Sequence, residues 1–185
     1  FMTKYLLNSG KASTSADKGK KFYNQIVEGL GSKPEILFCL FAQPRENWEQ
    51  RFNKLTTDFA AVLDTKIQPT YKLALPKEFT EQIESAQVIY IPGGDDRLLQ
   101  YWLKQYDLPL LWYGKTIATS SAGSDALVKH YWTCDWRECQ DGLGIVPVKF
   151  IPHFNSTYGN EDPRGPINWQ EAHKELETYG DTNLP

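Results

Sequence analysis

The sequence predicts an α/β protein built around a largely parallel β-sheet. Short apolar runs alternate with amphipathic segments along the 185 residues, and this alternation is typical of strands joined by crossover helices. The run EILFCLFA at residues 35–42 is almost continuously apolar, as expected for a strand that helices cover on both faces. Because ligands bind beyond the carboxyl ends of such strands, the residues after each strand are the ones to inspect for function.

The first half of the chain is expected to form three strands, each followed by a helix. The strands cover residues 3–7, 35–42 and 70–75, and the helices cover residues 13–31, 45–63 and 76–86. In the first helix Ser13 or Ser15 is the expected N-cap, and Gly31 ends the helix. The second helix carries apolar residues at three- and four-residue spacing, which we expect to face the core. Pro76 opens the third helix, where a missing N–H leaves no helical bond unmade.

The second half continues the same alternation. We expect strands at residues 87–92, at 115–120 and within 144–154, and helices at residues 96–105, 122–130 and 168–179. The first of these strands ends in Gly93 and Gly94, the second reaches Ser120 and Ser121, and the third ends near His153. In a parallel sheet these three strand ends can meet at one edge.

The composition excludes several classes of protein. Hydrophobic residues make up 41% and charged residues 23% of the chain, which is typical of a globular protein, and we expect one domain over residues 2–185. The formal net charge of −3 provides no basic footprint for nucleic acid. No apolar run approaches the roughly 20 residues that span a bilayer, and no signal-peptide pattern opens the chain. We interpret Phe1, which precedes Met2, as an added residue.

The three cysteines indicate a reducing compartment. Cys39, Cys134 and Cys139 are an odd and sparse set, which argues against a disulfide framework and for the cytoplasm. His130 precedes the last two, but three possible ligands without a second cysteine pair are a weak zinc pattern. We therefore do not expect a metal.

A Gly-Gly-Asp-Asp turn follows the strand at 87–92. Gly93 and Gly94 allow a tight turn and a close approach of the backbone to a ligand, and their N–H groups can face an anion or a developing oxyanion. The alternative is an ordinary strand-to-helix turn capped by Asp95 or Asp96. The sequence contains neither GxGxxG nor a Walker A pattern, so we do not expect nucleotide-phosphate binding.

The segment TSSAGSD at 119–125 has the composition of a nucleophile elbow, in which a serine stands on a sharp strand-to-helix turn between small residues. Ser120 has alanine two residues before and after it, whereas Ser121 has Thr119 before and Gly123 after. Steric size excludes neither serine, but the glycine and the immediate start of a helix favour Ser121. The alternative is a serine that only caps the helix.

His153 is the histidine best placed to act as a base. It follows a predicted strand, whereas His130 and His173 lie in or beside predicted helices. A serine hydrolase requires an imidazole at a neighbouring strand end, although a lone histidine is more often structural. Taken together, the three strand ends provide a nucleophile, a base and oxyanion donors, which favours an acyl-transfer hydrolase over a plain binding domain.

Four segments, in this order, resemble peptidase family S51, which includes dipeptidase E and the cyanophycinases. They are VIYIPGGDDRLLQYWLK, GKTIATSSAGSDAL, TCDW and DGLGIVPVKFIPHF, and the resemblance spans about residues 35–165. It implies a three-layer, flavodoxin-like fold related to class I glutamine amidotransferases. It also implies a serine peptidase that works without a cofactor.

The resemblance also implies roles for particular residues. The serine of Ser-Ala-Gly is the nucleophile, which selects Ser121, and His153 is the base. Gly94 and Ala122 provide the oxyanion N–H groups. Asp135, in the Thr-x-Asp context of TCD, corresponds to an acid that is important in the family; from the residues alone, a solvated loop carboxylate is the simpler interpretation.

The chain departs from the family pattern at two places. Thr119 replaces the more common glycine of the elbow. In the family a later strand and turn carry an acid that can orient the histidine, whereas this sequence ends at Pro185. We therefore expect either a domain without its C-terminal strand or an orienting carboxylate from elsewhere in the chain, with Asp135 as the candidate.

The expected substrate is a short peptide, in particular a dipeptide with N-terminal Asp. An aspartyl side chain needs a cation, and Arg164 is the candidate because a guanidinium binds a carboxylate bidentately. Asp95 is a second candidate for substrate binding, and Lys149 and Arg137 are weaker alternatives to Arg164. We expect a monomer or a homodimer, with no nucleic-acid or membrane partner.

Three other interpretations of the function remain open at this point. The protein could be a catalytically impaired family member that binds a peptide or an acidic small molecule. It could be an esterase of the α/β-hydrolase type, although no HGGG-like loop occurs. It could also be a cyanophycinase-like enzyme that releases β-linked Asp-Arg dipeptides.

Overall fold

The computed structural model describes residues 2–185, and Phe1 lies outside the described residues. Its centre is a five-stranded, entirely parallel sheet in the order β1-β5-β4-β2-β3. These strands are β1 (Lys4–Asn8), β2 (Glu35–Phe38), β3 (Thr70–Leu73), β4 (Val88–Ile91) and β5 (Thr116–Ser120). The predicted alternation of strands and helices is therefore confirmed.

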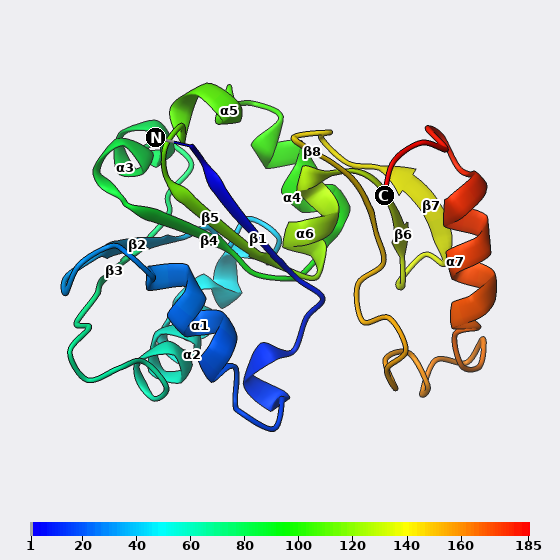
Figure 1. The fold of residues 1–185 in the computed structure, drawn as a ribbon, viewed down its shortest axis with the longest axis horizontal. Coiled ribbons are helices and arrows are strands. Elements are labelled where there is room, and N and C mark those ends of the chain that lie inside the picture. Colours follow the sequence, from blue (N-terminus) through cyan, green and yellow to red (C-terminus); the bar gives the residue numbers. More distant parts are fainter. Residues whose placement is uncertain (1) are drawn as a thin grey trace.

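Helices cover both faces of this sheet. They are α1 (Lys20–Val27), α2 (Trp48–Ala60), α3 (Phe79–Ser85), α4 (Asp96–Leu103), α5 (Leu108–Leu111) and α6 (Ala122–Leu127). Figure 1 shows α1 and α2 on one face and α3 and α5 on the other. The order β3-β2-β4-β5 matches the first four positions of a flavodoxin-like sheet, and β1 fills the fifth. The predicted three-layer, flavodoxin-like fold is thus confirmed.

Aromatic side chains fill the layer between the sheet and α2. Phe38 of β2 makes edge contacts with four other rings, those of Phe52, Phe59, Tyr71 and Tyr90. The apolar stripe of α2 faces the core as predicted, because its residues at three- and four-residue spacing fall on the buried face of the helix. This packing holds in place the strands whose carboxyl ends carry the candidate functional residues.

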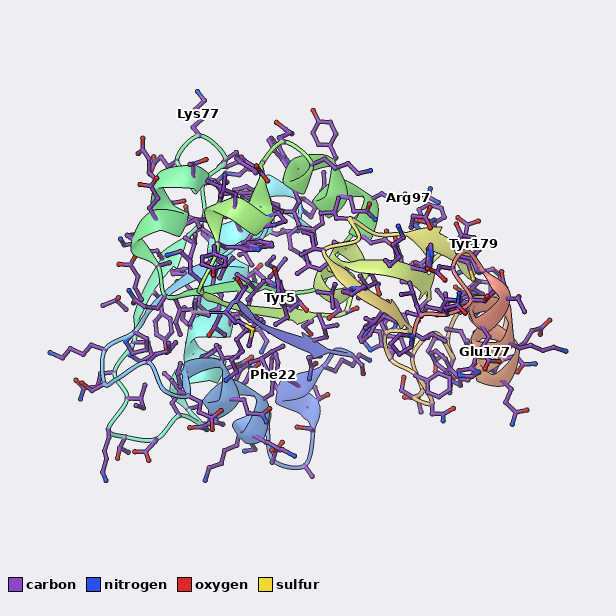
Figure 2. All side chains as sticks on the ribbon, turned by 45° about the horizontal axis from the view of Figure 1, so that its top comes forward. Tyr5, Phe22, Lys77, Arg97, Glu177 and Tyr179 are labelled. Atoms are coloured by element: carbon purple, nitrogen blue, oxygen red, sulfur yellow. The ribbon has the colours of Figure 1, made fainter. Side chains whose placement is uncertain are left out.

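A second, smaller sheet follows α6. It has the order β7-β6-β8, with β6 (Val128–Thr133) antiparallel to β7 (Glu138–Asp141) and parallel to β8 (Val146–Phe150). The last helix, α7 (Trp169–Thr178), packs on this sheet over a core of its own. Figure 1 shows α6 between the two sheets. Figure 2 shows Arg97 of α4 beside the smaller sheet, where it pairs with Glu138 at 2.9 Å.

Three predicted helix boundaries are wrong. The helix predicted over 122–130 ends at Leu127, because the following Val-Lys-His-Tyr-Trp-Thr is rich in strand-forming residues and pairs with both β7 and β8. The first helix begins only after Gly19 rather than at a serine cap, and it ends at Val27 rather than at Gly31. At its start the Asp17 carboxylate accepts hydrogen bonds from the backbone N–H groups of Gly19 and Lys21. Of the helices in residues 2–185, none has the length and apolar character needed to cross a membrane.

Candidate active site

Ser121 stands on a strained turn between β5 and α6. Its backbone has φ 52° and ψ −119°, a conformation that is unfavourable for a non-glycine residue and is typical of a nucleophile elbow. Its N–H donates to the carbonyl oxygen of Asn8 at 2.9 Å, and its own carbonyl accepts from the N–H groups of Ser124 and Asp125. The hydrogen bonds to the last residue of β1 and to the first turn of α6 hold the strained residue in place.

The residues around Ser121 explain why this elbow closes. A Cβ at Gly123 would lie 2.1 Å from the carbonyl oxygen of Ile91, so α6 can approach β4 only because this residue is a glycine. Thr119 is fully buried, and its hydroxyl lies 2.8 Å from that of Ser124. The threonine is accommodated because its hydroxyl is paired inside the core.

His153 reaches Ser121 from the turn that follows β8 of the smaller sheet. Its Nε2 lies 2.9 Å from Ser121 Oγ, which is within reach for proton transfer. The backbone N–H of His153 donates to the carbonyl of Ser9, and the residue has only 8% of its surface exposed. The hydroxyl of Ser120 points elsewhere, to Asn8 Oδ1 at a long 3.4 Å. The structure thus pairs the histidine with the second of the two serines.

The His153 ring is held by a second aromatic ring. Tyr158 stacks on it with ring centroids 4.1 Å apart and an interplanar angle of 4°. The Tyr158 hydroxyl donates to Asp135 Oδ1 at 2.8 Å. Burial lowers the pKa of His153, and the Lys11 ammonium lowers it further, whereas the Asp135 carboxylate raises it. The lowered pKa favours the neutral imidazole, which can accept a proton.

Asp135 lies near His153 but does not bind it directly. Its Oδ1 is hydrogen-bonded to the tyrosine, and within residues 2–185 no group is hydrogen-bonded to Nδ1 of His153. Any influence of Asp135 on the imidazole acts through Tyr158 and through its charge. The sequence offered no signal for Tyr158, because its stack depends on how the chain turns after β8.

The two expected oxyanion donors lie in the same cavity. Gly94 follows β4 and Ala122 opens α6, and both line a cavity of about 570 Å³ together with Ser121 and His153. Within the described part of the chain, neither backbone N–H takes part in a hydrogen bond. Both N–H groups are thus available to a developing oxyanion.

The two expected substrate ligands lie outside the residues that line this cavity. Asp95 caps α4 by accepting from the N–H of Leu98 at 2.9 Å, as the alternative interpretation had it. The guanidinium of Arg164 is held by Asp162, at 2.8 Å through Nε and 2.6 Å through Nη2. It also donates to the backbone carbonyl of Asp135.

The two weaker alternatives are held by backbone carbonyls as well. Arg137 donates to the carbonyl of Gly165. Lys149 donates to three backbone carbonyls at the end of α7. Both contacts lie outside the residues that line the cavity.

Charged side chains that sequence reasoning missed also line the cavity. The basic ones come from the loop after β1 and from α2, and the acidic ones come from α4 and α6. They are Lys11, Arg51, Lys54, Asp96 and Asp125. The sequence did not indicate these residues as a group, because they are far apart along the chain and belong to no local motif other than the capping turns already described.

The fold and this site define a class: α/β proteins in which a serine on a nucleophile elbow faces a histidine and a pair of free N–H groups, as in acyl-transfer hydrolases. The model of peptidase family S51 matches residues 5–181. The chain therefore belongs to peptidase family S51. No curated protein matches the sequence.

Two solved structures share the fold. The first is a peptidase from an acI-B1 Actinobacterium, 24% identical over all of this chain and 77% of that chain, with a TM-score of 0.61. The second is a protein of Listeria monocytogenes EGD-e assigned to peptidase E, 17% identical over 95% of this chain and 88% of that chain, with a TM-score of 0.64. At these identities the likeness concerns the fold.

Proposed function

We propose that this member of family S51 is a serine-type peptidase that cleaves short peptides through an acyl-enzyme on Ser121. The observation that carries the proposal is the 2.9 Å separation of Ser121 Oγ and His153 Nε2 at a strained elbow. Ser121 then attacks the scissile carbonyl while His153 takes its proton. His153 returns the proton to the leaving amine. Water then attacks the acyl-enzyme: His153 takes a proton from the water and returns it to the Ser121 oxygen as the acyl group leaves.

The backbone supplies the electrostatic part of this mechanism. Gly94 and Ala122 line the cavity that holds Ser121, and in this proposal their N–H groups bind the oxyanion; removing one such donor typically costs about 100- to 1,000-fold in kcat. Asp135 acts in this proposal as a positioning residue, since it contacts Tyr158 rather than the imidazole.

For the substrate we propose dipeptides with an N-terminal acidic residue, Asp in particular. The support is Arg51 of α2, which lines the cavity and whose Nε is buried without a hydrogen-bond partner. A guanidinium with an open donor fits a substrate carboxylate. Lys11, also on the cavity, adds positive charge. Arg164 remains a prediction, but its Nε and Nη2 already donate to Asp162, and it lies outside the residues that line the cavity.

We further propose that the enzyme works in the cytoplasm. All three cysteines are free, two of them buried, which suits a reducing compartment.

The test is the hydrolysis of Asp-X dipeptides by wild type and by Ser121→Ala, with Ser120→Ala as the matched control. We expect Ser121→Ala to lose turnover by several orders of magnitude and Ser120→Ala to keep most of it. Equal rates for wild type and Ser121→Ala would show that Ser121 is not the nucleophile. A serine-directed phosphonate should label wild type and not Ser121→Ala, which distinguishes an active enzyme from an impaired family member that only binds.

A further inference from the structure

Two buried carboxyl groups line the active-site cavity without a role in the acyl-transfer steps. Asp96, in the first turn of α4, is 6% exposed, and Asp125, in α6, is 3% exposed. The two helices pack against each other, and both side chains border the same cavity as Ser121. Aspartate is rarely buried to this degree unless it is paired.

Each of these carboxyl groups has an oxygen without a partner. Oδ2 of Asp96 and Oδ1 of Asp125 are buried and make no hydrogen bond within the described residues. Buried polar atoms are almost always hydrogen-bonded, because an unpaired one loses its hydration without compensation. Two such oxygens on one cavity indicate that a ligand supplies the missing donors.

The charge of the pair indicates which donors are missing. Burial raises the pKa of Asp125 well above its usual value, and the neighbouring Asp96 carboxylate raises it further. Burial likewise raises the pKa of Asp96. A cation beside the two carboxyl groups would reduce this repulsion and offer the donors that they lack.

We propose that Asp96 and Asp125 form a subsite for the free α-ammonium group of the substrate's N-terminal residue. This inference rests on the proposed peptidase function and deepens it. An ammonium group offers three N–H donors, which suits the two open oxygens. No cluster of three or more His, Cys, Asp or Glu side chains in residues 2–185 is arranged to hold a metal ion.

The position of the pair relative to Ser121 favours an α-ammonium over a side-chain cation. Asp125 lies in α6, four residues after Ser121, which is the N-cap of this short helix; four helical residues rise by about 6 Å. In a peptide the α-nitrogen is two bonds from the carbonyl carbon that the serine attacks. The cations of lysine and arginine side chains are several bonds further from that carbonyl carbon, so they would extend beyond Asp96 and Asp125.

The subsite means that the cavity is lined by both acidic and basic side chains. Asp96 and Asp125 lie on α4 and α6, whereas Lys11 and Arg51 come from the loop after β1 and from α2. An N-terminal aspartyl residue has an ammonium group and a carboxylate on adjacent carbons, and it matches this distribution. Acylation of the amino group removes the positive charge and the three donors, so the pair would reject blocked peptides.

The first experiment compares two substrates that differ only in the amino group. Asp-X dipeptides and the corresponding succinyl-X compounds are assayed with wild type, Asp96→Asn and Asp125→Asn. Asp107→Asn, which changes an exposed aspartate outside the cavity, is the control. We expect each active-site variant to lower kcat/KM for Asp-X by about 10- to 100-fold and to leave succinyl-X within about 3-fold of wild type. Turnover of succinyl-X shows that the variants are folded.

Equal losses on both substrates, or no loss on Asp-X, would overturn the inference. N-acetyl-Arg-X is a third substrate and should not be cleaved. If it were cleaved and the cleavage required Asp96 and Asp125, the pair would recognise a side-chain cation and the α-ammonium assignment would be wrong.

The second experiment separates this inference from the proposed function. Aspartate and succinate are titrated into Ser121→Ala by calorimetry, with and without Asp96→Asn or Asp125→Asn. We expect aspartate to bind at least about 10-fold more tightly than succinate, and either added substitution to remove the difference. If wild type shows no Ser121-dependent turnover but this difference is found, the peptidase proposal fails and the subsite stands. If turnover depends on Ser121 but aspartate and succinate bind alike, the subsite fails and the peptidase stands.

Discussion

Removing the hydroxyl of Tyr158 is expected to slow catalysis without weakening substrate binding. The Tyr158 ring stacks on His153 at 4.1 Å, and its hydroxyl is fixed by Asp135 at 2.8 Å. Because no group within residues 2–185 binds Nδ1 of His153, this stack is the main restraint on the imidazole ring within the described chain. Tyr158→Phe keeps the ring but releases it from Asp135, whereas Tyr158→Ala removes both contacts.

The magnitude follows from the two contacts. A hydrogen bond to a charged group contributes about 1.5–3 kcal/mol, so its complete loss would lower kcat by about 10- to 150-fold at most. An aromatic stack contributes about 0.5–1.5 kcal/mol beyond its buried area. Tyr158→Ala should therefore lose a further factor of about 2 to 10.

The assay is steady-state kinetics on an Asp-X dipeptide for both variants, with Tyr106→Phe as the control. The Tyr106 hydroxyl makes a hydrogen bond of the same 2.8 Å length, to the carbonyl of Pro76, away from the cavity. In Tyr158→Phe we expect the loss in kcat with KM unchanged, whereas a merely structural role would move thermal stability and leave kcat per folded molecule intact. The reasoning is refuted if Tyr158→Phe keeps full kcat and Tyr158→Ala stays within 2-fold of it.

Three further predictions concern the base, the smaller sheet and the pH profile. Gly10→Ala should lower kcat by about 100-fold, because Gly10 has φ +121° and a Cβ there would lie 2.2 Å from the His153 ring; unchanged kinetics would show that the ring does not need this position. Lys149→Met should lower the free energy of unfolding in urea by about 1.5–3 kcal/mol, since the ammonium group holds three carbonyls at the end of α7; a change below about 0.5 kcal/mol would contradict this. The acid limb of kcat/KM for wild type should have its midpoint below pH 6.5, because burial lowers the pKa of His153 and the base must be neutral to act. Lys11→Met, which removes a nearby positive charge, should move that midpoint up, and Asp135→Asn should move it down; a shift in the opposite direction for either variant would refute the electrostatic assignment.

Local rules in the sequence were sufficient for the fold class, whereas for the choice of serine they favoured Ser121 and the family resemblance selected it. Strand and helix periods act over a few residues, and they gave the layers and the parallel sheet correctly. Gly123 and the immediate start of α6 favoured Ser121 over Ser120, and the structure shows the same serine at the strained turn. The sequence failed at the end of α6, because only pairing with β7 and β8 turns the residues from Val128 onward into a strand.

The sequence by itself determined the elements, the elbow and the list of candidate side chains. Only the tertiary structure decided which of them meet. His153 lies 32 residues from Ser121 and reaches it from the second sheet, while Asp135 contacts Tyr158 rather than the imidazole itself. Contacts of this kind depend on the path of the backbone between elements, which no short-range pattern specifies. The opposed charges of the cavity, brought together from four separate segments, are the clearest case.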